Sequence, residues 1–438
     1  MKKLLVLAIV LFAAAPAYAA FCELSWGTAT AVSQARVGSG GGAYDNQLVV
    51  FGGYDNTGTG ALDDTWVYDP ATDAWTAKAT MPAKTVDLGY CVAPEGYAYA
   101  VGGSTDSVAY TDEVQEYDID ADTWTTLTNP FPHVCWGPLC AAPGDGYVYC
   151  FGGTEDGSTA ITDAEKYQIG SDGAWTAISP LPVGKVFGAA VVLDGKIYLT
   201  GGWSADDVTY VYDPNTDSYT TLDNLNYGRQ RPSLIAAGGQ LWLAGGADTW
   251  TPVDTDEYFD LTSWTETGTT IGTPVLGATA GYLTGYGIYF AGGRDGSLAD
   301  RSENQVWQVC IPEFESVTPD SGAAGTSITI AGYTFEENVV PTLFDATKAE
   351  YPLENIVVVD DATITADIPA TLADGSYGLM FDGTLGQHTE FPDVFEVTSV
   401  DDDTTDDDVT DDDVTDDDAD DDDDAAGDDD DDDSGCGC

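Results

Sequence analysis

Positive charge is the scarcest property of this sequence. Its 438 residues include 13 Lys and Arg against 76 Asp and Glu, and the formal net charge is -63 at pH 7. A surface of that sign repels nucleic acid and anionic lipid, so neither is expected as a partner. Long amphipathic helical patterns are also missing, whereas glycine and aromatic residues are plentiful. These features favour an all-β fold.

Histidine and recognisable catalytic motifs are scarce too. The two histidines are His133 and His388, and neither a Ser-His-Asp set nor a zinc-ligand spacing is visible. Carboxylate pairs are too abundant in so acidic a chain to indicate a catalytic dyad. We therefore assign no catalytic residue, no metal site and no cofactor to the folded part.

The first 19 residues have the features of a secretory signal. Two lysines are followed by an apolar run and by the small-residue cleavage pattern Ala17-Tyr18-Ala19. This pattern predicts a secreted or cell-surface protein whose mature chain begins near Ala20. No later segment is apolar for long enough to span a bilayer. Export makes the eight cysteines candidates for disulfides.

An apolar segment that ends in two glycines recurs six times. Successive first glycines are 50, 50, 49, 44 and 47 residues apart, a period that is typical of propellers and solenoids. The six pairs are Gly52-Gly53, Gly102-Gly103, Gly152-Gly153, Gly201-Gly202, Gly245-Gly246 and Gly292-Gly293.

Each glycine pair precedes a polar loop, a short alternating strand, a turn and an aromatic residue. In the first unit the strand is Trp66-Val67-Tyr68 and the aromatic is Trp75. The sixth unit has the equivalent strand around Trp307 but no aromatic strand after it. An unassigned tryptophan strand lies instead around Trp26. The N-terminal strand is therefore expected to complete the sixth unit and to close a ring.

The order of Gly-Gly, Tyr-Asp-Pro or a similar turn, Trp, and then Met81-Pro82 or Leu181-Pro182 resembles the Kelch repeat. The resemblance covers about residues 22 to 310. It implies a six-bladed propeller of four-stranded antiparallel blades around a central channel, which we place at residues 20-310.

The cysteine positions allow two disulfides to be predicted. Alignment of the units places Cys22 and Cys310 in the same hairpin turn, where a bond would join the two ends of the ring. Cys140 and Cys150 are equidistant from a turn near Asp145 and can lie opposite each other. The alternatives for this second pair are buried free thiols, or pairings that use the remaining cysteines of the propeller, Cys91 and Cys135.

From Ile311 the pattern changes. The Ser-x-x-Pro-x-Ser-Gly opening at Ser316, the strand Gly325-Thr326-Ser327-Ile328-Thr329-Ile330 and the following Phe335 resemble an IPT/TIG domain. That resemblance implies an immunoglobulin-like β-sandwich at residues 311-398, which serves in binding or as a spacer.

Residues 399-438 form an Asp-rich tail that ends in Cys436-Gly437-Cys438. Self-repulsion and the lack of apolar residues predict a disordered, solvated spacer, with weak calcium binding as the alternative. The end resembles the cysteine-bearing part of bacterial surface-sorting tails, which implies envelope attachment. The alternative is an exposed redox-active or disulfide-bonded tip.

A propeller joined to an immunoglobulin-like module also resembles the galactose-oxidase-like copper enzymes. That resemblance implies two His and two Tyr ligands, with one Tyr adjacent to a His. The sequence contains no Tyr-His pair, so copper catalysis is not expected.

A basic residue precedes the innermost strand in every unit except the sixth, and a collar of these residues around one channel mouth would hold an anionic group. Kelch propellers that bind acidic peptides present arginines at similar positions, as the resemblance implies. The alternative is that acidic loops on the same face neutralise the collar by internal pairing. Trp203 and Trp250, in those loops, either stack on sugars or pack between blades. The collar consists of Arg36, Lys84, His133, Lys185, and Arg229 or Arg231.

The sequence thus favours an exported, non-enzymatic protein that recognises a protein or a glycan through its propeller loops. The rival interpretation is a secreted carbohydrate-active propeller enzyme that uses channel carboxylates with Arg229 or Arg231.

Overall fold

The structure is a computed structural model that describes residues 22-105, 109-171, 173-204, 206-383 and 387-398. The predicted signal segment and the predicted Asp-rich tail, with Cys436 and Cys438, lie outside these residues. Every helix or strand assigned in the described ranges is a β-strand. Within them no helix is long and apolar enough to cross a membrane.

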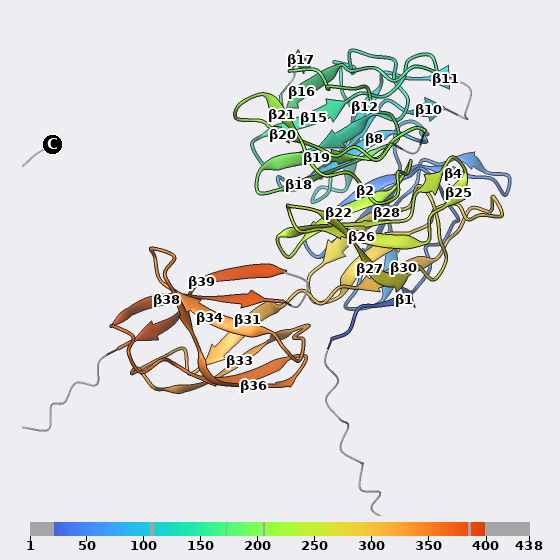
Figure 1. Cartoon of the computed structure of the whole chain (residues 1–438). Coiled ribbons are helices and arrows are strands. Elements are labelled where there is room, and N and C mark those ends of the chain that lie inside the picture. The colour runs from blue at the N-terminus through green and yellow to red at the C-terminus, as the bar shows by residue number, and fades with distance from the viewer. Residues whose placement is uncertain (1–21, 106–108, 172, 205, 384–386, 399–438) are drawn as a thin grey trace, which may run out of the picture. The chain divides into compact units, whose positions relative to one another are not determined.

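Six four-stranded antiparallel sheets account for residues 25-308 (Figure 1). We call them blades one to six, in the chain order of their innermost strands. Blade one consists of β2 (Gly40–Tyr44), β3 (Gln47–Phe51), β6 (Thr65–Asp69) and β7 (Ala74–Lys78), and blade two of β8 (Gly89–Ala93), β9 (Tyr97–Val101), β12 (Val114–Asp118) and β13 (Thr123–Thr126). Blade three consists of β14 (Leu139–Ala141), β15 (Tyr147–Phe151), β16 (Ala164–Gln168) and β17 (Thr176–Ala177), and blade four of β18 (Ala189–Leu193), β19 (Lys196–Thr200), β20 (Tyr210–Asp213) and β21 (Ser218–Thr221). Blade five consists of β22 (Ser233–Ala237), β23 (Gln240–Ala244), β26 (Thr255–Phe259) and β27 (Trp264–Thr270), and blade six of β28 (Thr279–Leu283), β29 (Gly287–Ala291), β30 (Asn304–Gln308) and β1 (Ser25–Ala29).

Three two-stranded hairpins extend the loops that follow the glycine pairs of blades one, two and five. They are β4 (Tyr54–Asp55) with β5 (Gly60–Ala61), β10 (Ser104–Thr105) with β11 (Ala109–Tyr110), and β24 (Ala247–Asp248) with β25 (Thr251–Pro252).

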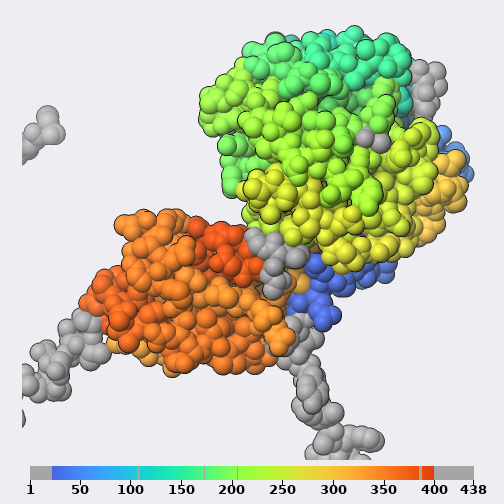
Figure 2. All heavy atoms as spheres, in the orientation of Figure 1, coloured from blue at the N-terminus to red at the C-terminus, as the bar shows by residue number. Residues whose placement is uncertain are grey.

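The innermost strands lie next to one another in a closed cycle, β2-β8-β14-β18-β22-β28 and back to β2. A separate buried apolar cluster fills the space between each pair of neighbouring blades, including blades six and one. The second strand of each blade is an almost continuous apolar run because neighbours pack on both of its faces, as in the sequence Gln47–Phe51 of β3. Figure 2 shows blades coloured green to yellow packed side by side.

The N-terminal strand closes the ring. β1 pairs antiparallel with β30, and Trp26 lies opposite Trp307 with the two rings stacked 5.3 Å apart. A disulfide joins Cys22 to Cys310 at this seam, and a second joins Cys140 of β14 to Cys150 of β15. Both bonds are the predicted ones. Cys91 and Cys135 are free, buried thiols.

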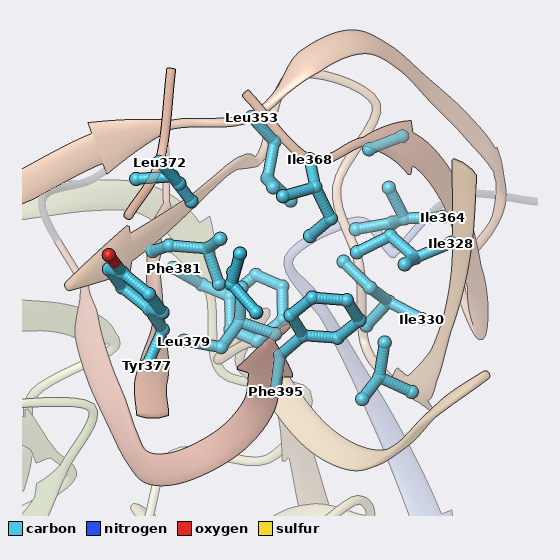
Figure 3. Close-up of a cluster of buried hydrophobic side chains, with 14 of the residues drawn as sticks. Ile328, Ile330, Leu353, Ile364, Ile368, Leu372, Tyr377, Leu379, Phe381 and Phe395 are labelled. Carbon is cyan, nitrogen blue, oxygen red and sulfur yellow. The ribbon is translucent and has the colours of Figure 1, made fainter. Parts of the chain in front are cut away.

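Residues 313-383 and 387-397 fold as two sheets around one apolar core, which contains Ile330, Phe381 and Phe395 (Figure 3). One sheet has the order β31-β33-β37-β36 and the other the order β32-β39-β38-β34-β35. The strands are β31 (Glu313–Thr318), β32 (Ser321–Gly322), β33 (Ser327–Tyr333), β34 (Val340–Phe344), β35 (Glu350–Pro352), β36 (Glu354–Asp360), β37 (Thr363–Asp367), β38 (Gly375–Asp382) and β39 (His388–Val397).

Candidate functional site

The six innermost strands enclose a cavity of about 400 Å³ along the propeller axis. Its wall consists mainly of Gly, Ala, Val, Leu and Pro residues. Among the described residues that line it, Asp87 is the only acid and Arg231 the only base. Both lie at the end of the cavity where the chain enters the innermost strands, and we call this end the channel mouth.

A ring of backbone hydrogen bonds surrounds the channel mouth. One residue from each blade takes part, and each donates its N–H to the carbonyl of the equivalent residue in the preceding blade over 2.6 to 3.0 Å. The cycle is complete, because Gly38 of blade one donates to Gly277 of blade six. The ring residues are Gly38, Asp87, Gly137, Phe187, Arg231 and Gly277.

All six ring residues adopt left-handed backbone conformations, with φ between 50° and 67°. Glycine adopts this conformation freely, whereas a residue with a side chain is strained there, by about 1 to 3 kcal/mol. The glycines also leave room for their neighbours. A Cβ atom on Gly38 would lie 2.5 Å from Oδ1 of Asp87, and one on Gly137 would lie 2.6 Å from the Phe187 ring. The ring therefore accommodates three strained side chains beside three glycines.

Asp87 and Arg231 form an ion pair across the mouth. They precede the innermost strands of blades two and five, which lie three places apart in the cycle of six and are therefore opposite each other. Nε of Arg231 donates to Oδ1 of Asp87 over 3.1 Å, and Nη2 donates to Oδ2 over 3.0 Å. The two side chains are only 8% and 15% exposed. Phe187 supports the pair, because the guanidinium carbon lies 3.6 Å from its ring centroid.

Tryptophan rings surround this pair. Trp136 packs edge-on against Phe187 with centroids 4.6 Å apart, and Trp203 lies 5.6 Å from Phe187. The ring centroid of Trp250 lies 5.6 Å from the guanidinium carbon of Arg231, and Trp250 is 53% exposed. The indole N–H of Trp136 is buried and has no hydrogen-bond partner among the described residues. The sequence-predicted residues Arg231, Trp203 and Trp250 are thus brought together, beside Asp87 and Phe187, which sequence reasoning missed.

Three residues of the predicted collar have a structural role instead. Arg36, Lys185 and Arg229 are buried, and each donates to the carbonyl of the first glycine in its own unit. Burial lowers the pKa of Lys185 and Arg229, and an adjacent carboxylate opposes that shift in each case. The prediction that these three residues form a ligand-binding collar is therefore wrong. They pair internally with carboxylates of the acidic loops, which is the alternative given above. The pairs are Arg36 with Asp64, Lys185 with Asp206, and Arg229 with Glu257.

Lys84 and His133 do not reach the mouth either. The positions equivalent to Arg36 are Thr85 and Cys135, whose side chains donate to the glycine carbonyls of blades two and three. Lys84 and His133 precede these positions by one and two residues. Lys84 is exposed, and Nδ1 of His133 lies 2.9 Å from Glu155. The prediction failed because it followed residue charge rather than the register of the repeat.

Comparison with known proteins assigns the chain to a family of propellers. The family model described as the Attractin/LZTR1 beta-propeller matches residues 21–255, which is more than half of the chain. The chain belongs to this family. Residues after 255 complete blade five and, together with β1, form blade six. The prediction of a Kelch-type, all-β propeller is confirmed by this match and by the Kelch relatives.

Several curated relatives match parts of this chain. Kelch repeat and BTB domain-containing protein 1 of cowpox virus is 33% identical over 87 residues, which are 18% of this chain and 15% of the relative. Alpha-scruin of Limulus polyphemus is 27% identical over 223 residues, 47% of this chain and 24% of the relative. Kelch-like protein 23 of Pongo abelii is 27% identical over 204 residues, which are 45% of this chain and 35% of the relative. The chain therefore spans about a third or less of the length of these relatives.

Two solved structures share the fold. The alignment with YjhT covers 64% of this chain and 99% of the YjhT chain, with 14% identity and a TM-score of 0.53. A fungal alcohol oxidase of the AA5 family, in complex with copper, covers 83% of this chain and 85% of its own, with 21% identity and a TM-score of 0.50. In the described part of this chain, no three His, Cys, Asp or Glu side chains are grouped so that they could hold a metal. At 14% and 21% identity, the likeness to these structures concerns the fold alone.

Proposed function

We propose that this protein is a non-enzymatic recognition protein that binds its partner at the channel mouth. The observation that carries the proposal is the set of three strained side chains in the ring, Asp87, Phe187 and Arg231. Glycine at these positions would make the same backbone bonds without strain, as it does in the other three blades. Strain of this kind concentrates at functional sites, where the surrounding structure stabilises it. The partly exposed Trp250 beside the three residues adds a contact surface of the type that dominates binding energetics.

The composition of the cavity supports binding over catalysis. Glycoside hydrolysis in most enzyme families requires two carboxyl groups that flank the scissile bond. Asp87 is the only acid among the described lining residues, and Arg231 already binds both of its oxygens. Arg229, the other arginine of the rival interpretation, is buried against Glu257. The described residues that line the channel therefore offer no carboxylate pair of the kind that such an enzyme uses.

We also propose that the protein is exported and displayed at the cell surface. The secretory pattern of residues 1-19 supports a secreted or cell-surface location, and the two disulfides in the structure fit an oxidising compartment. We assign the two-sheet domain of residues 311-398 to the IPT/TIG type, as a spacer or second binding module. The Asp-rich tail is then a solvated spacer that attaches the protein to the envelope through its cysteines.

Arrays of immobilised glycans and peptides test this function. The mature chain and the variants Trp250→Ala and Arg231→Lys are applied with Tyr286→Ala as a matched control. Tyr286 is 37% exposed and lies in the β28-β29 turn, at the opposite end of the blade. We expect retained, unmodified ligands whose capture falls in both mouth variants and not in the control. Equal capture by all four proteins, or release of a cleaved product, would contradict the proposal.

A further inference from the structure

We infer that the channel mouth recognises a neutral sugar through two neighbouring hydroxyl groups. This inference rests on the proposed function, because it names the ligand class of the same site. It follows from the hydrogen-bonding capacity that the Asp87–Arg231 pair leaves unused, from the charge of the site, and from the aromatic rings around it.

The ion pair has donors and acceptors to spare. A guanidinium has five N–H donors and a carboxylate has about four acceptor positions. The described contacts of Arg231 use three donors, two to Asp87 and one from Nη1 to Oε1 of Gln230 at 3.3 Å. Arg231 uses two acceptor positions of Asp87, one on each oxygen. The pair therefore keeps unused donors on Arg231 and unused acceptors on Asp87.

Hydroxyl groups match this arrangement without breaking the pair. Each hydroxyl both donates and accepts, so one of two neighbouring hydroxyls can donate to Asp87 while the other accepts from Arg231. A ligand carboxylate would bring a second negative charge beside Asp87, and a ligand ammonium would bring a second positive charge beside Arg231. Either ligand would leave an unbalanced charge at a nearly buried site, which is costly. The net charge of -63 further disfavours anionic ligands.

The aromatic rings supply the rest of a sugar site. A pyranose has an apolar C–H face that packs against an exposed aromatic ring, and Trp250 offers such a ring beside the guanidinium. The Trp136 ring centroid lies 5.9 Å from the guanidinium carbon, and the buried indole N–H of this residue has no hydrogen-bond partner among the described residues. A bound hydroxyl oxygen or an ordered water would satisfy it.

Titration of the mature chain with simple glycosides tests the inference. The neutral probes are methyl α-D-mannopyranoside, methyl β-D-galactopyranoside and methyl β-D-glucopyranoside, and the charged probes are methyl β-D-galacturonide and a lysine-rich peptide. Saturation-transfer NMR and tryptophan fluorescence report binding. We expect saturable binding of at least one neutral glycoside, weakened about tenfold or more in Trp250→Ala by loss of the aromatic face. Tyr286→Ala should bind as the wild type does.

The outcomes separate the ligand class from the function. Tighter binding of the galacturonide than of methyl β-D-galactopyranoside would overturn the neutral-sugar inference. So would neutral binding that is unchanged in Trp250→Ala, or no neutral binding at all. If only the peptide binds, and Trp250→Ala abolishes that binding, recognition at the mouth stands while the sugar assignment fails. If no probe and no arrayed ligand responds to Trp250→Ala, both proposals fail.

Discussion

The carboxylate of Asp87 and the guanidinium of Arg231 meet across the channel mouth, although 144 residues separate them in the sequence. The pair links blades two and five directly, in addition to the backbone ring that links each blade to its neighbours. Because both side chains are nearly buried, each would be left without a charged partner if the other were removed. The pair therefore connects the proposed ligand site to the stability of the ring.

Removal of either partner should destabilise the propeller. We expect Asp87→Asn and Arg231→Gln each to lower the free energy of unfolding by about 1 to 3 kcal/mol, below the full cost for a completely buried pair. The double variant should lose less than the sum of the two, because the interaction is removed only once. Urea denaturation of all four proteins measures this coupling energy. The same cycle on the exposed pair of Lys348 and Glu390 is the control, with an expected coupling of about 0 to 1 kcal/mol. A coupling energy no larger than that of the control would contradict the prediction.

Gly137, one of the six ring residues, should be required for the packing of Phe187. Gly137 has φ 66° and a Cβ there would lie 2.6 Å from the Phe187 ring, whereas Gly170 has φ 68° and open space around its Cβ position. Gly137→Ala combines backbone strain with a clash, and Gly170→Ala brings strain alone. We expect Gly170→Ala to cost about 1 kcal/mol and Gly137→Ala to cost at least about 1 to 3 kcal/mol more. Thermal denaturation compares the two, and equal losses would show that Phe187 moves aside without cost.

Much of the scaffold could be predicted because it repeats. The glycine pairs, the aromatic strands and the unassigned strand at Trp26 are local signals, and six copies make their order and spacing unambiguous. The pairing of β1 with β30 and the disulfide between Cys22 and Cys310 follow from aligning incomplete units, without knowledge of any side-chain contact.

The site could be predicted only in part, because the ring is a tertiary feature. The backbone of Asp87, Phe187 and Arg231 is held in the left-handed region by bonds between blades that no local pattern reveals. A usable signal was nevertheless present. The ring residues precede the first glycine of their units by 14 or 15 residues, and three of the six are glycine. Alignment by register, instead of by charge, would have separated these positions from the structural Arg36.

Aspartates in the outer hairpins connect neighbouring blades in a repeated way. Oδ1 of Asp73 accepts from the hydroxyl of Tyr68 in its own blade and from the backbone N–H of Thr30 after β1, both over 2.8 Å. Oδ1 of Asp122 makes the same pair of bonds, with Tyr117 over 2.7 Å and with Ala79 over 2.8 Å. In blade four the equivalent residues are Asp217, Tyr212 and Ser179.

These bonds should make the propeller sensitive to acid. Backbone hydrogen bonds lower the pKa of Asp73 and Asp122, and for Asp217 the hydrogen bonds outweigh the opposing effect of burial. Since the folded pKa values lie below the unfolded values of about 3.9, the stabilisation is complete above that pH and is lost as pH falls through the folded values. We expect the free energy of unfolding to fall less steeply below about pH 4 in the triple variant Asp73→Asn/Asp122→Asn/Asp217→Asn.

A charge-matched variant controls for net charge in that experiment. Asp194, Asp223 and Asp374 are exposed, and their substitution by Asn changes the net charge equally. Urea denaturation between pH 7 and pH 3 should show a shallower acid slope for the hairpin variant than for the charge-matched one. Identical slopes would mean that the blade-linking aspartates are not the source of acid sensitivity.

The two disulfides should differ in their contribution to stability. Cys22 and Cys310 are 288 residues apart, whereas Cys140 and Cys150 are 10 apart. In the chain-entropy model the longer loop contributes about 6 kcal/mol and the shorter loop about 3 kcal/mol, because a bond that closes a longer loop restricts the unfolded chain more. We expect Cys22→Ser/Cys310→Ser to lower the urea midpoint more than Cys140→Ser/Cys150→Ser does. Only the first variant should release β1 to limited proteolysis, because its bond fixes the strand that completes blade six. A larger loss from the second variant, or a protected N-terminus in the first, would place the stabilising effect in local packing of blade three instead of in ring closure.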